Sequence, residues 1–252
     1  MRKIPLIFSG IVSLVILLVA CSKADTAATG QTVYTAVATA FGAQIDLNNL
    51  ANYAAQSKPA YITKDNTGNN PIINAKATLG RVLFYDKKLS IDNTISCASC
   101  HKQAFAFSDN QLVSTGVAGG KTDRHSMRLV NERFGVETKF FWDERATSLE
   151  SQTTQPIADH NEMGFSGQAG RVGIAALLTK LQGVDYYNEL FKFVYGDITV
   201  TEPRLQECLA QFVRSIQSFD AKYDMGRAQV NNDRQPFPNF TAQENAGKDL
   251  FL

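Results

Sequence analysis

Apolar residues recur every three or four positions along much of the chain, which is the spacing of an amphipathic helix. The clearest stretch runs over 202–219, where Thr201 is placed to cap the helix and Pro203 lies in its first turn. Its apolar stripe consists of Leu205, Leu209, Phe212, Ile216 and Phe219. Cys208 lies on this stripe and is expected to be a small core residue. No segment alternates convincingly between apolar and polar residues, so the pattern predicts an all-α fold.

Weaker helical patterns lie on both sides of this segment. Three of them have an apolar face, and Gly183 separates the last two. Their ranges are 77–86, 172–181 and 184–195. Two capping boxes, Thr147 with Glu150 and Thr241 with Glu244, predict the starts of further helices. The second of these helices would run to the end of the chain.

The chain begins with a pattern typical of exported proteins. Two basic residues precede an apolar run over 4–20, which ends in a sequence, LVAC, that resembles the lipobox of bacterial lipoproteins. We therefore expect residues 1–20 to be a signal peptide and Cys21 to be lipidated. The protein would then be lipid-anchored on the periplasmic side of the cell envelope. The alternative is an uncleaved anchor, although the run is at the short limit for crossing a bilayer.

Composition divides the rest of the chain into three parts. Residues 21–70 are rich in small and polar side chains and are expected to form a tether and polar linker. Residues 71–230 carry most helical patterns and are expected to form one domain. Residues 231–252 join a proline-containing linker to the start of a helix, where a second domain would begin. The 25 basic and 24 acidic residues nearly balance, so nothing indicates nucleic-acid binding.

Cys97, Cys100 and His101 form the CxxCH pattern of c-type haem attachment. Two thiols on one helical turn can reach the two vinyl groups of a porphyrin, and the next residue points its imidazole at the iron. A redox dithiol would not need the adjacent histidine. A zinc site would need further ligands at suitable spacing, which the sequence lacks. The sequence therefore predicts one haem c, with His101 as the proximal ligand of its iron.

The sixth coordination position of the haem iron distinguishes an electron carrier from a catalyst. A sixth ligand would give an electron-transfer site, whereas an open position would give a catalytic one. The candidate ligands are His125, His160, Met127 and Met163, and composition does not choose among them. Glu162, beside a glycine turn, could instead exchange a proton with peroxide at this position. The alternative for Glu162 is a solvated loop carboxylate.

Beyond the haem motif, six segments follow one another in a characteristic order. They are LGRVLFYDKKLS (79–90), CASCHKQAFAFSD (97–109), RHSMRLVNERF (124–134), FFWDERATSLESQ (140–152), PIADHNEMG (156–164) and FVRSIQSFDAKYD (212–224). Together they resemble the bacterial dihaem cytochrome c peroxidase family, over about 70–252. The resemblance implies two all-α, cytochrome c-like domains with long loops and one haem each. The N-terminal haem would reduce peroxide, and the C-terminal haem would pass electrons to it.

The resemblance also implies roles for individual residues. Glu162 matches the distal acid–base glutamate, and Gln152 matches the glutamine that shares the distal pocket with it. Trp142 matches the tryptophan between the haems, on the electron path. Asn131 matches an asparagine that contributes to a calcium site, whose other ligands lie in the second domain.

Two departures from the family pattern alter these expectations. The loop 114–121 lacks the histidine that in many relatives blocks the iron until the enzyme is reduced. The haem is therefore expected to be open without reductive activation, unless His125 or His160 substitutes. The second departure is GKDLFL (247–252), which resembles the beginning of the second domain but is followed by no second CxxCH. The sequence is expected to be a fragment or a shortened chain, and sustained turnover is not expected of it alone.

These observations predict a cytochrome c peroxidase-like oxidoreductase that reduces hydrogen peroxide to water. Its electrons would come from a second haem or from a small periplasmic c-type cytochrome, and a homodimer is a further expectation. One alternative is a plain electron-transfer cytochrome with a six-coordinate haem. The other is a dihaem enzyme that uses peroxide to oxidise side chains of a partner protein.

Overall fold

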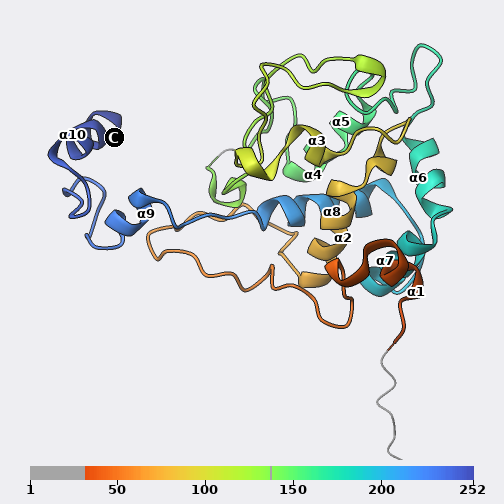
Figure 1. The fold of residues 1–252 in the computed structure, drawn as a ribbon, viewed down its shortest axis with the longest axis horizontal. Coiled ribbons are helices and arrows are strands. Elements are labelled where there is room, and N and C mark those ends of the chain that lie inside the picture. The colour runs from red at the N-terminus through yellow and green to blue at the C-terminus, as the bar shows by residue number, and fades with distance from the viewer. Residues whose placement is uncertain (1–31, 137) are drawn as a thin grey trace, which may run out of the picture. The chain divides into compact units, whose positions relative to one another are not determined.

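A computed structural model describes residues 32–136 and 138–252, and all regular structure in these residues is helical (Figure 1). The α-helices are α1 (Thr35–Phe41), α2 (Asn74–Tyr85), α3 (Cys97–Cys100), α4 (Leu149–Thr153), α5 (Gln155–Ala158), α6 (Ile174–Gln182), α7 (Asp185–Tyr195), α8 (Glu202–Arg214), α9 (Lys222–Arg227) and α10 (Ala242–Phe251). The 3-10 turns are η1 (Gly42–Gln44), η2 (Lys87–Leu89), η3 (Gln103–Phe105), η4 (Val117–Gly119) and η5 (Glu132–Phe134). The all-α prediction is confirmed. The expected signal peptide and Cys21 lie outside the described residues.

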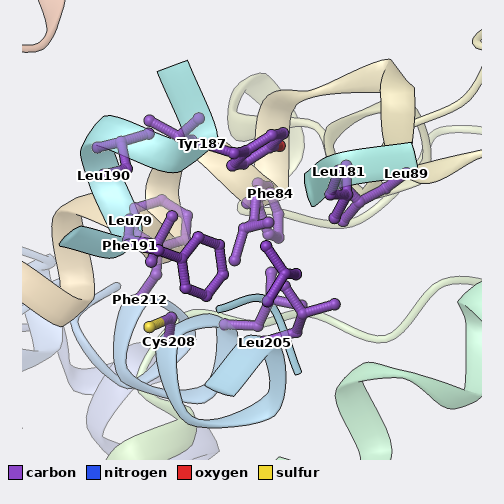
Figure 2. Close-up of a cluster of buried hydrophobic side chains, with 14 of the residues drawn as sticks. Leu79, Phe84, Leu89, Leu181, Tyr187, Leu190, Phe191, Leu205, Cys208 and Phe212 are labelled. Atoms are coloured by element: carbon purple, nitrogen blue, oxygen red, sulfur yellow. The ribbon is translucent and has the colours of Figure 1, made fainter. Parts of the chain in front are cut away.

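The hydrophobic core forms where α2 packs against α8, and α7 adds its apolar face to the same cluster (Figure 2). The apolar residues predicted on α2 are buried there, as are Leu205, Leu209, Phe212 and Ile216 of the second stripe, whereas Phe219 is only partly buried. Cys208 is a fully buried core residue as expected. Gly80 allows the close approach of the two helices, because a Cβ at this position would lie 1.9 Å from the carbonyl oxygen of Cys208. The core therefore fixes α2 and α8 at a separation that only glycine permits.

Three predicted helices lie close to their expected bounds. Helices α6 and α7 occupy the two segments that Gly183 separates, and Gly183 ends α6 as its C-terminal cap. Helix α10 begins at the predicted capping box. The Glu244 N–H donates to the Thr241 hydroxyl oxygen at 3.2 Å, and the Thr241 N–H donates to the Glu244 carboxylate at 2.7 Å.

Helix α8 ends five residues earlier than the apolar pattern predicts, at Arg214 rather than residue 219. The following backbone bonds to another loop instead of continuing the helix. The Asn131 N–H donates to the Ile216 carbonyl at 2.9 Å, and the Asn131 carboxamide both accepts from the Ser218 N–H and donates to the Ser218 carbonyl, at 2.9 and 2.8 Å. These tertiary hydrogen bonds hold residues 216–218 outside the helix, although Ile216 remains buried.

The capping box expected from Thr147 and Glu150 is wrong by one residue. Ser148 caps α4, and its hydroxyl oxygen accepts from the Ser151 N–H at 3.1 Å. The Glu150 carboxylate is instead paired with Arg214 of α8 and accepts from the Asn70 amide at 2.8 Å. This tertiary ion pair takes the carboxylate away from the local capping role that the sequence suggests.

Part of the expected tether is ordered and packs on the core. Within the segment 21–70, helix α1 buries Val37, and the residues after it bury Ile45 and Leu47. The Glu189 carboxylate on α7 accepts hydrogen bonds from the N–H groups of Ala36 and Val37, at 3.0 and 2.9 Å, and so caps α1. The prediction of a bare tether is therefore corrected for this part, because a distant carboxylate supplies a cap that the local sequence lacks.

Candidate active site

The haem motif lies on a single short turn of helix. Helix α3 spans Cys97–Cys100, and the hydroxyl of Ser99 accepts from the Ser96 N–H at 3.0 Å, which caps the start of the turn. The His101 N–H donates to the Cys97 carbonyl at 2.9 Å, so the histidine directly follows the turn. The two thiols and the imidazole are therefore presented by adjacent backbone positions, as the attachment of one porphyrin requires.

The motif faces a cavity of about 840 Å³. This volume is within the range of about 300–1,000 Å³ that is usual for ligand and cofactor sites. All the site residues implied by the family resemblance line the cavity. These are Cys97, Cys100, His101, Asn131, Trp142, Gln152 and Glu162. The structure thus brings together residues that are separated by up to 65 positions in the chain.

The imidazole of His101 is oriented by a backbone carbonyl. Its Nδ1 lies 3.0 Å from the carbonyl oxygen of Phe107, so a proton on Nδ1 donates there and leaves Nε2 available for a metal. Burial lowers the pKa of His101, while the carbonyls of Phe107 and Met127 act in the opposite direction. The ring is therefore held in the neutral form that coordinates iron.

The turn that contains Phe107 has a strained backbone, and contacts of Lys102 with Ser108 and Asp109 stabilise it. Ala106 and Phe107 both have a φ of 55°, which is unusual for residues with side chains. The Lys102 N–H donates to the Ser108 carbonyl at 2.8 Å, closing the turn. The Lys102 ammonium pairs with Asp109 at 2.7 Å. These contacts fix the carbonyl that orients the proximal histidine.

Asp109 connects this turn to the following loop. Its carboxylate accepts from the Lys102 ammonium and, at 2.6 Å, from the Ser114 hydroxyl. Burial would raise the pKa of Asp109, but these partners and the Asn110 N–H outweigh it and lower the pKa to about 2. The aspartate is therefore a fixed charge that ties the proximal turn to the loop 114–121.

The two cysteines of the motif are half-buried, and their thiols are not activated for redox chemistry. Burial raises the pKa of Cys97 to about 12, and burial also raises the pKa of Cys100. Redox-active CxxC pairs depend on a lowered thiol pKa, so the dithiol reading is not supported. Within residues 32–136 and 138–252, no group of three or more His, Cys, Asp or Glu side chains is arranged to hold a metal ion. The zinc reading therefore has no support in this part of the chain.

Glu162 presents a carboxylate to the cavity from the loop after α5. Asp159 fixes this loop, because its carboxylate accepts from the N–H groups of Asn161 and Glu162, at 2.8 and 2.9 Å. Burial raises the pKa of Glu162 to about 7, and the charge of Asp159 adds to the rise, while Arg145 opposes it. The carboxylate has no hydrogen-bond partner among the described residues. It can therefore both take up and release a proton near neutral pH.

Glycines allow the Glu162 loop to be covered closely by the loop 114–121. A Cβ on Gly116 would lie 1.9 Å from the Asn161 carbonyl oxygen, and a Cβ on Gly120 would lie 2.6 Å from the same atom. The Val117 N–H donates to the Glu162 carbonyl at 3.0 Å. Residues 114–121 support the backbone of Glu162 and do not line the cavity. The loop 114–121, which lacks the histidine expected from the family resemblance, therefore supports the backbone of Glu162 from outside the cavity.

Trp142 lies at the cavity in a tight, strained loop. Its side chain is 59% exposed, and its indole N–H donates to the His125 carbonyl at 2.9 Å. Phe141 has a φ of 73°, and the guanidinium of Arg145 lies 3.5 Å from the centre of its ring. Asp143 accepts from the guanidinium groups of Arg124 and Arg145, both at 2.9 Å. Ion pairs and a cation–π contact thus stabilise the loop that carries the exposed Trp142.

Gln152 reaches the cavity from α4. The side chain is partly buried and makes no hydrogen bond with the described residues, so its amide is available to a ligand in the cavity. The Gln152 N–H bonds to the Ser148 carbonyl at 3.1 Å within the first turn of α4. The cap at Ser148 therefore sets the direction in which Gln152 points.

The four candidate axial ligands are placed differently. Met127, Met163 and His125 line the cavity, whereas His160 does not. His125 uses both ring nitrogens in other contacts, with the Gln111 carbonyl at 2.8 Å and the Ser108 hydroxyl at 3.2 Å. His160 contacts the Ser166 hydroxyl through Nδ1 at 2.9 Å. Among the candidates that line the cavity, the two methionines therefore have a ligating atom that no hydrogen bond with the described residues occupies, whereas both ring nitrogens of His125 are used.

Asn131 has a structural task in this chain. Its carboxamide bonds to both backbone groups of Ser218 and so fixes the segment that follows α8. Its φ of 63° is typical of asparagine in a left-handed turn. The calcium site that the resemblance implies stays a prediction, since the described residues include no cluster of acidic ligands around Asn131.

Sequence reasoning gives no role to several residues that shape the site. Arg145 lies close enough to Glu162 to lower its pKa, and Asp109 and the Phe107 carbonyl support His101. No spacing signal distinguishes these residues, because their roles depend on contacts between loops. The assigned residues were found because they carry a motif or a family match.

The residues present fit a c-type haem. The cavity has the necessary size, two thiols lie on one turn at its wall, and a neutral imidazole directly follows them. An all-α domain with a CxxCH turn facing such a cavity defines a cytochrome c-type domain.

The chain belongs to the di-haem cytochrome c peroxidase family, whose profile matches residues 74–232. Methylamine utilization protein MauG of Methylophilus methylotrophus is 32% identical over 155 residues, which cover 62% of this chain and 44% of that protein. Cytochrome c551 peroxidase of Nitrosomonas europaea is 31% identical over 148 residues, or 59% of this chain and 42% of that protein. The chain therefore spans less than half the length of these two curated relatives.

A solved structure confirms the fold class. The crystal structure of a MauG-like protein associated with microbial copper homeostasis superposes with a TM-score of 0.60 at 29% identity. The match covers 78% of this chain and 54% of that one. The family resemblance and the cytochrome c-like, all-α fold predicted from the sequence are thus confirmed, and the family supports haem c as the cofactor.

Proposed function

We propose that the protein to which this chain belongs reduces hydrogen peroxide to water at a haem c held by Cys97, Cys100 and His101. The observation that carries the proposal is the position of Glu162. A half-buried carboxylate whose pKa burial raises to about 7 lines the same cavity as the haem motif. The haem, when bound, supplies the iron and the electrons for cleavage of the peroxide bond.

The distal residues would handle the protons and the orientation of peroxide. The Glu162 carboxylate would take a proton from one oxygen of peroxide and return it to the other, which would leave as water. No described residue hydrogen-bonds to this carboxylate, so both of its oxygens are free for this transfer. The Gln152 amide can donate to peroxide from the wall of the same cavity. His101 remains neutral and fixed by the Phe107 carbonyl.

Electrons would enter past Trp142. This side chain is largely exposed in the described structure and also lines the cavity, so it can connect the haem site to a donor. The donor would be a second haem of the same protein or a small c-type cytochrome. A homodimer remains part of this proposal.

The proposed location is the periplasmic face of a membrane, reached through a lipid on Cys21. The support is the sequence pattern over 1–21. Among residues 32–136 and 138–252, no helix has the length and apolarity to cross a bilayer.

The test is the variant Glu162→Gln, which preserves shape and removes the proton acceptor. We expect the kcat/KM for peroxide to fall by about 10²–10⁴-fold, the usual effect of losing a positioned acid–base group. The absorption spectrum of the haem should change little. The matched control is Glu144→Gln, because Glu144 also lines the cavity but its side chain is 70% exposed. Wild-type turnover in Glu162→Gln would refute the assignment.

A six-coordinate electron carrier is the second candidate, because Met127 and Met163 both line the cavity. Thioether sulfur is a common axial ligand in electron-transfer cytochromes. The two functions predict different spectra. A methionine-ligated haem would be low-spin in both redox states and would not consume peroxide. The Met127→Leu and Met163→Leu variants would identify the ligand by loss of the low-spin spectrum.

A further inference from the structure

Two adjacent tyrosines at the start of α7 share one carboxylate oxygen. Asp86 directly follows α2, and its Oδ1 accepts from the Lys88 N–H at 2.8 Å, which fixes the side chain. Its Oδ2 accepts from the Tyr186 hydroxyl at 2.6 Å and from the Tyr187 hydroxyl at 2.8 Å. Both phenolic protons therefore point at the same basic atom.

The two phenols differ in their access to solvent. Tyr187 is completely buried, whereas Tyr186 is only partly buried at the start of α7. Their ring centres lie 4.7 Å apart. The Tyr186 ring also meets Phe41 edge-on at 5.0 Å, and the Lys88 ammonium lies 5.6 Å from its centre. The pair thus extends from the core toward the surface.

The buried end of the pair is next to the haem motif. Tyr187 belongs to the core cluster against which Cys97 packs, and the two side chains are close enough for charge on Cys97 to raise the pKa of Tyr187. Phe84, which lines the cavity, lies in the same cluster, as Figure 2 shows. The buried phenol therefore belongs to the same cluster of core side chains as Phe84 of the cavity wall and Cys97 of the haem motif.

A hydrogen bond to a carboxylate controls how a phenol can be oxidised. An oxidised phenol becomes very acidic and releases its proton, so one-electron oxidation in a dry site needs a base in contact with the hydroxyl. Tyr187 is a buried phenol with such a base, and burial raises its pKa so that it does not ionise by itself. A purely structural contact between α7 and the end of α2 would need only one of the two phenols.

We propose that Tyr187, Asp86 and Tyr186 form a redox relay that carries an oxidising equivalent from the haem site toward the surface. This inference rests on the proposed peroxidase function, because peroxide supplies the oxidant. The relay would remove an oxidising equivalent when the normal electron donor is absent, and so would protect the haem pocket.

Each step of the relay balances. Tyr187 gives one electron to the haem site oxidised by peroxide, and its phenolic proton moves to Oδ2 of Asp86. Tyr186 then gives one electron to the Tyr187 phenoxyl radical, while Asp86 returns its proton to the Tyr187 oxygen and takes the proton of Tyr186. A one-electron reductant in solution finally reduces the Tyr186 radical, which recovers its proton from Asp86.

The experiment mixes the haem-loaded protein with hydrogen peroxide in the absence of a donor and freezes it within milliseconds. Electron paramagnetic resonance, with ring-deuterated tyrosine as the marker, measures the tyrosyl radical, and peroxide consumption is measured in the same samples. The variants are Tyr187→Phe, which keeps the ring, and Asp86→Asn, which keeps an acceptor oxygen but not the base. Tyr85→Phe is the matched control, because the Tyr85 ring contacts Phe84 but its hydroxyl bonds to no carboxylate among the described residues.

We expect a tyrosyl radical in the wild-type protein and in Tyr85→Phe. In Asp86→Asn the rate of radical formation should fall roughly 100-fold, as expected when a positioned base is removed. Tyr187→Phe should remove the radical without slowing peroxide consumption. Peroxide consumption without a tyrosyl radical, or an unchanged radical in Tyr187→Phe, would overturn the relay alone. A wild-type protein that does not consume peroxide would overturn both this inference and the peroxidase proposal.

Discussion

Gly80 sets the distance between the two helices that carry one wall of the cavity. It lies in the middle of α2, and an alanine Cβ there would lie 1.9 Å from the Cys208 carbonyl oxygen and 2.9 Å from the Phe212 Cβ. Both of these atoms are held by α8. Neither can move as the end of a flexible side chain could, so Gly80→Ala must displace one helix or the other.

The magnitude follows from two opposed effects. Alanine is favoured over glycine in a helix interior by about 1 kcal/mol. Against this, the new methyl group is about 1.5 Å short of ordinary contact distance with the Cys208 oxygen, and overpacking of a core costs typically about 1–3 kcal/mol or more. The contacts are to the backbone of Cys208 and to the Cβ of Phe212, and neither can move without moving α8, so we expect the upper part of that range. The net loss of unfolding free energy should be about 2 kcal/mol.

Urea unfolding of the haem-loaded protein measures this effect, with an unchanged m-value and a lower midpoint as the expected result. Gly247→Ala on α10 is the control, because a Cβ there meets no atom within 4 Å and should stabilise the helix by up to about 1 kcal/mol. Leu209 and Val213 of α8 line the cavity, so Gly80→Ala should also perturb the haem spectrum. A Gly80→Ala protein as stable as wild type would show that the two helices are not held at a fixed separation.

Two further predictions concern charged side chains. Glu162 must be ionised to accept a proton from peroxide, and its pKa is raised to about 7, so kcat/KM should rise with pH up to about 7 and then level off. A pH profile that is flat from about pH 5 to 8 would contradict this role. Arg214→Leu should reduce the unfolding free energy by about 3 kcal/mol, because it leaves the partly buried Glu150 carboxylate without its ionic partner. Burial acts to raise the pKa of Glu150, but Arg214 and Asn70 lower it, so the stabilisation is lost as pH falls through that lowered value. A variant as stable as wild type in thermal unfolding at neutral pH would show that the pair contributes nothing.

Local patterns predicted the helices that form the core. The sequence predicted the apolar faces of α2, α6 and α7 and the capping box of α10. These features depend on residues only three or four positions apart. The sequence did not predict where α8 ends, because that end depends on hydrogen bonds from Asn131, which lies 85 residues before Ile216. The sequence also did not predict that residues 33–50 fold against the core. The reason is the same, because the cap of α1 is Glu189 on α7, which is distant in the sequence.

For the candidate site, too, some features follow from the sequence and others only from the tertiary structure. The sequence by itself determined which side chains are available for chemistry: the CxxCH motif, the carboxylate of Glu162, the amide of Gln152 and the aromatic ring of Trp142. These residue types follow from motif spacing and from family likeness, which need no coordinates. Only the tertiary structure decided that they line one cavity and that burial brings the pKa of Glu162 near neutrality. The physical reason is that desolvation and electrostatic coupling depend on which loops fold against each other, and linear spacing does not encode those distances.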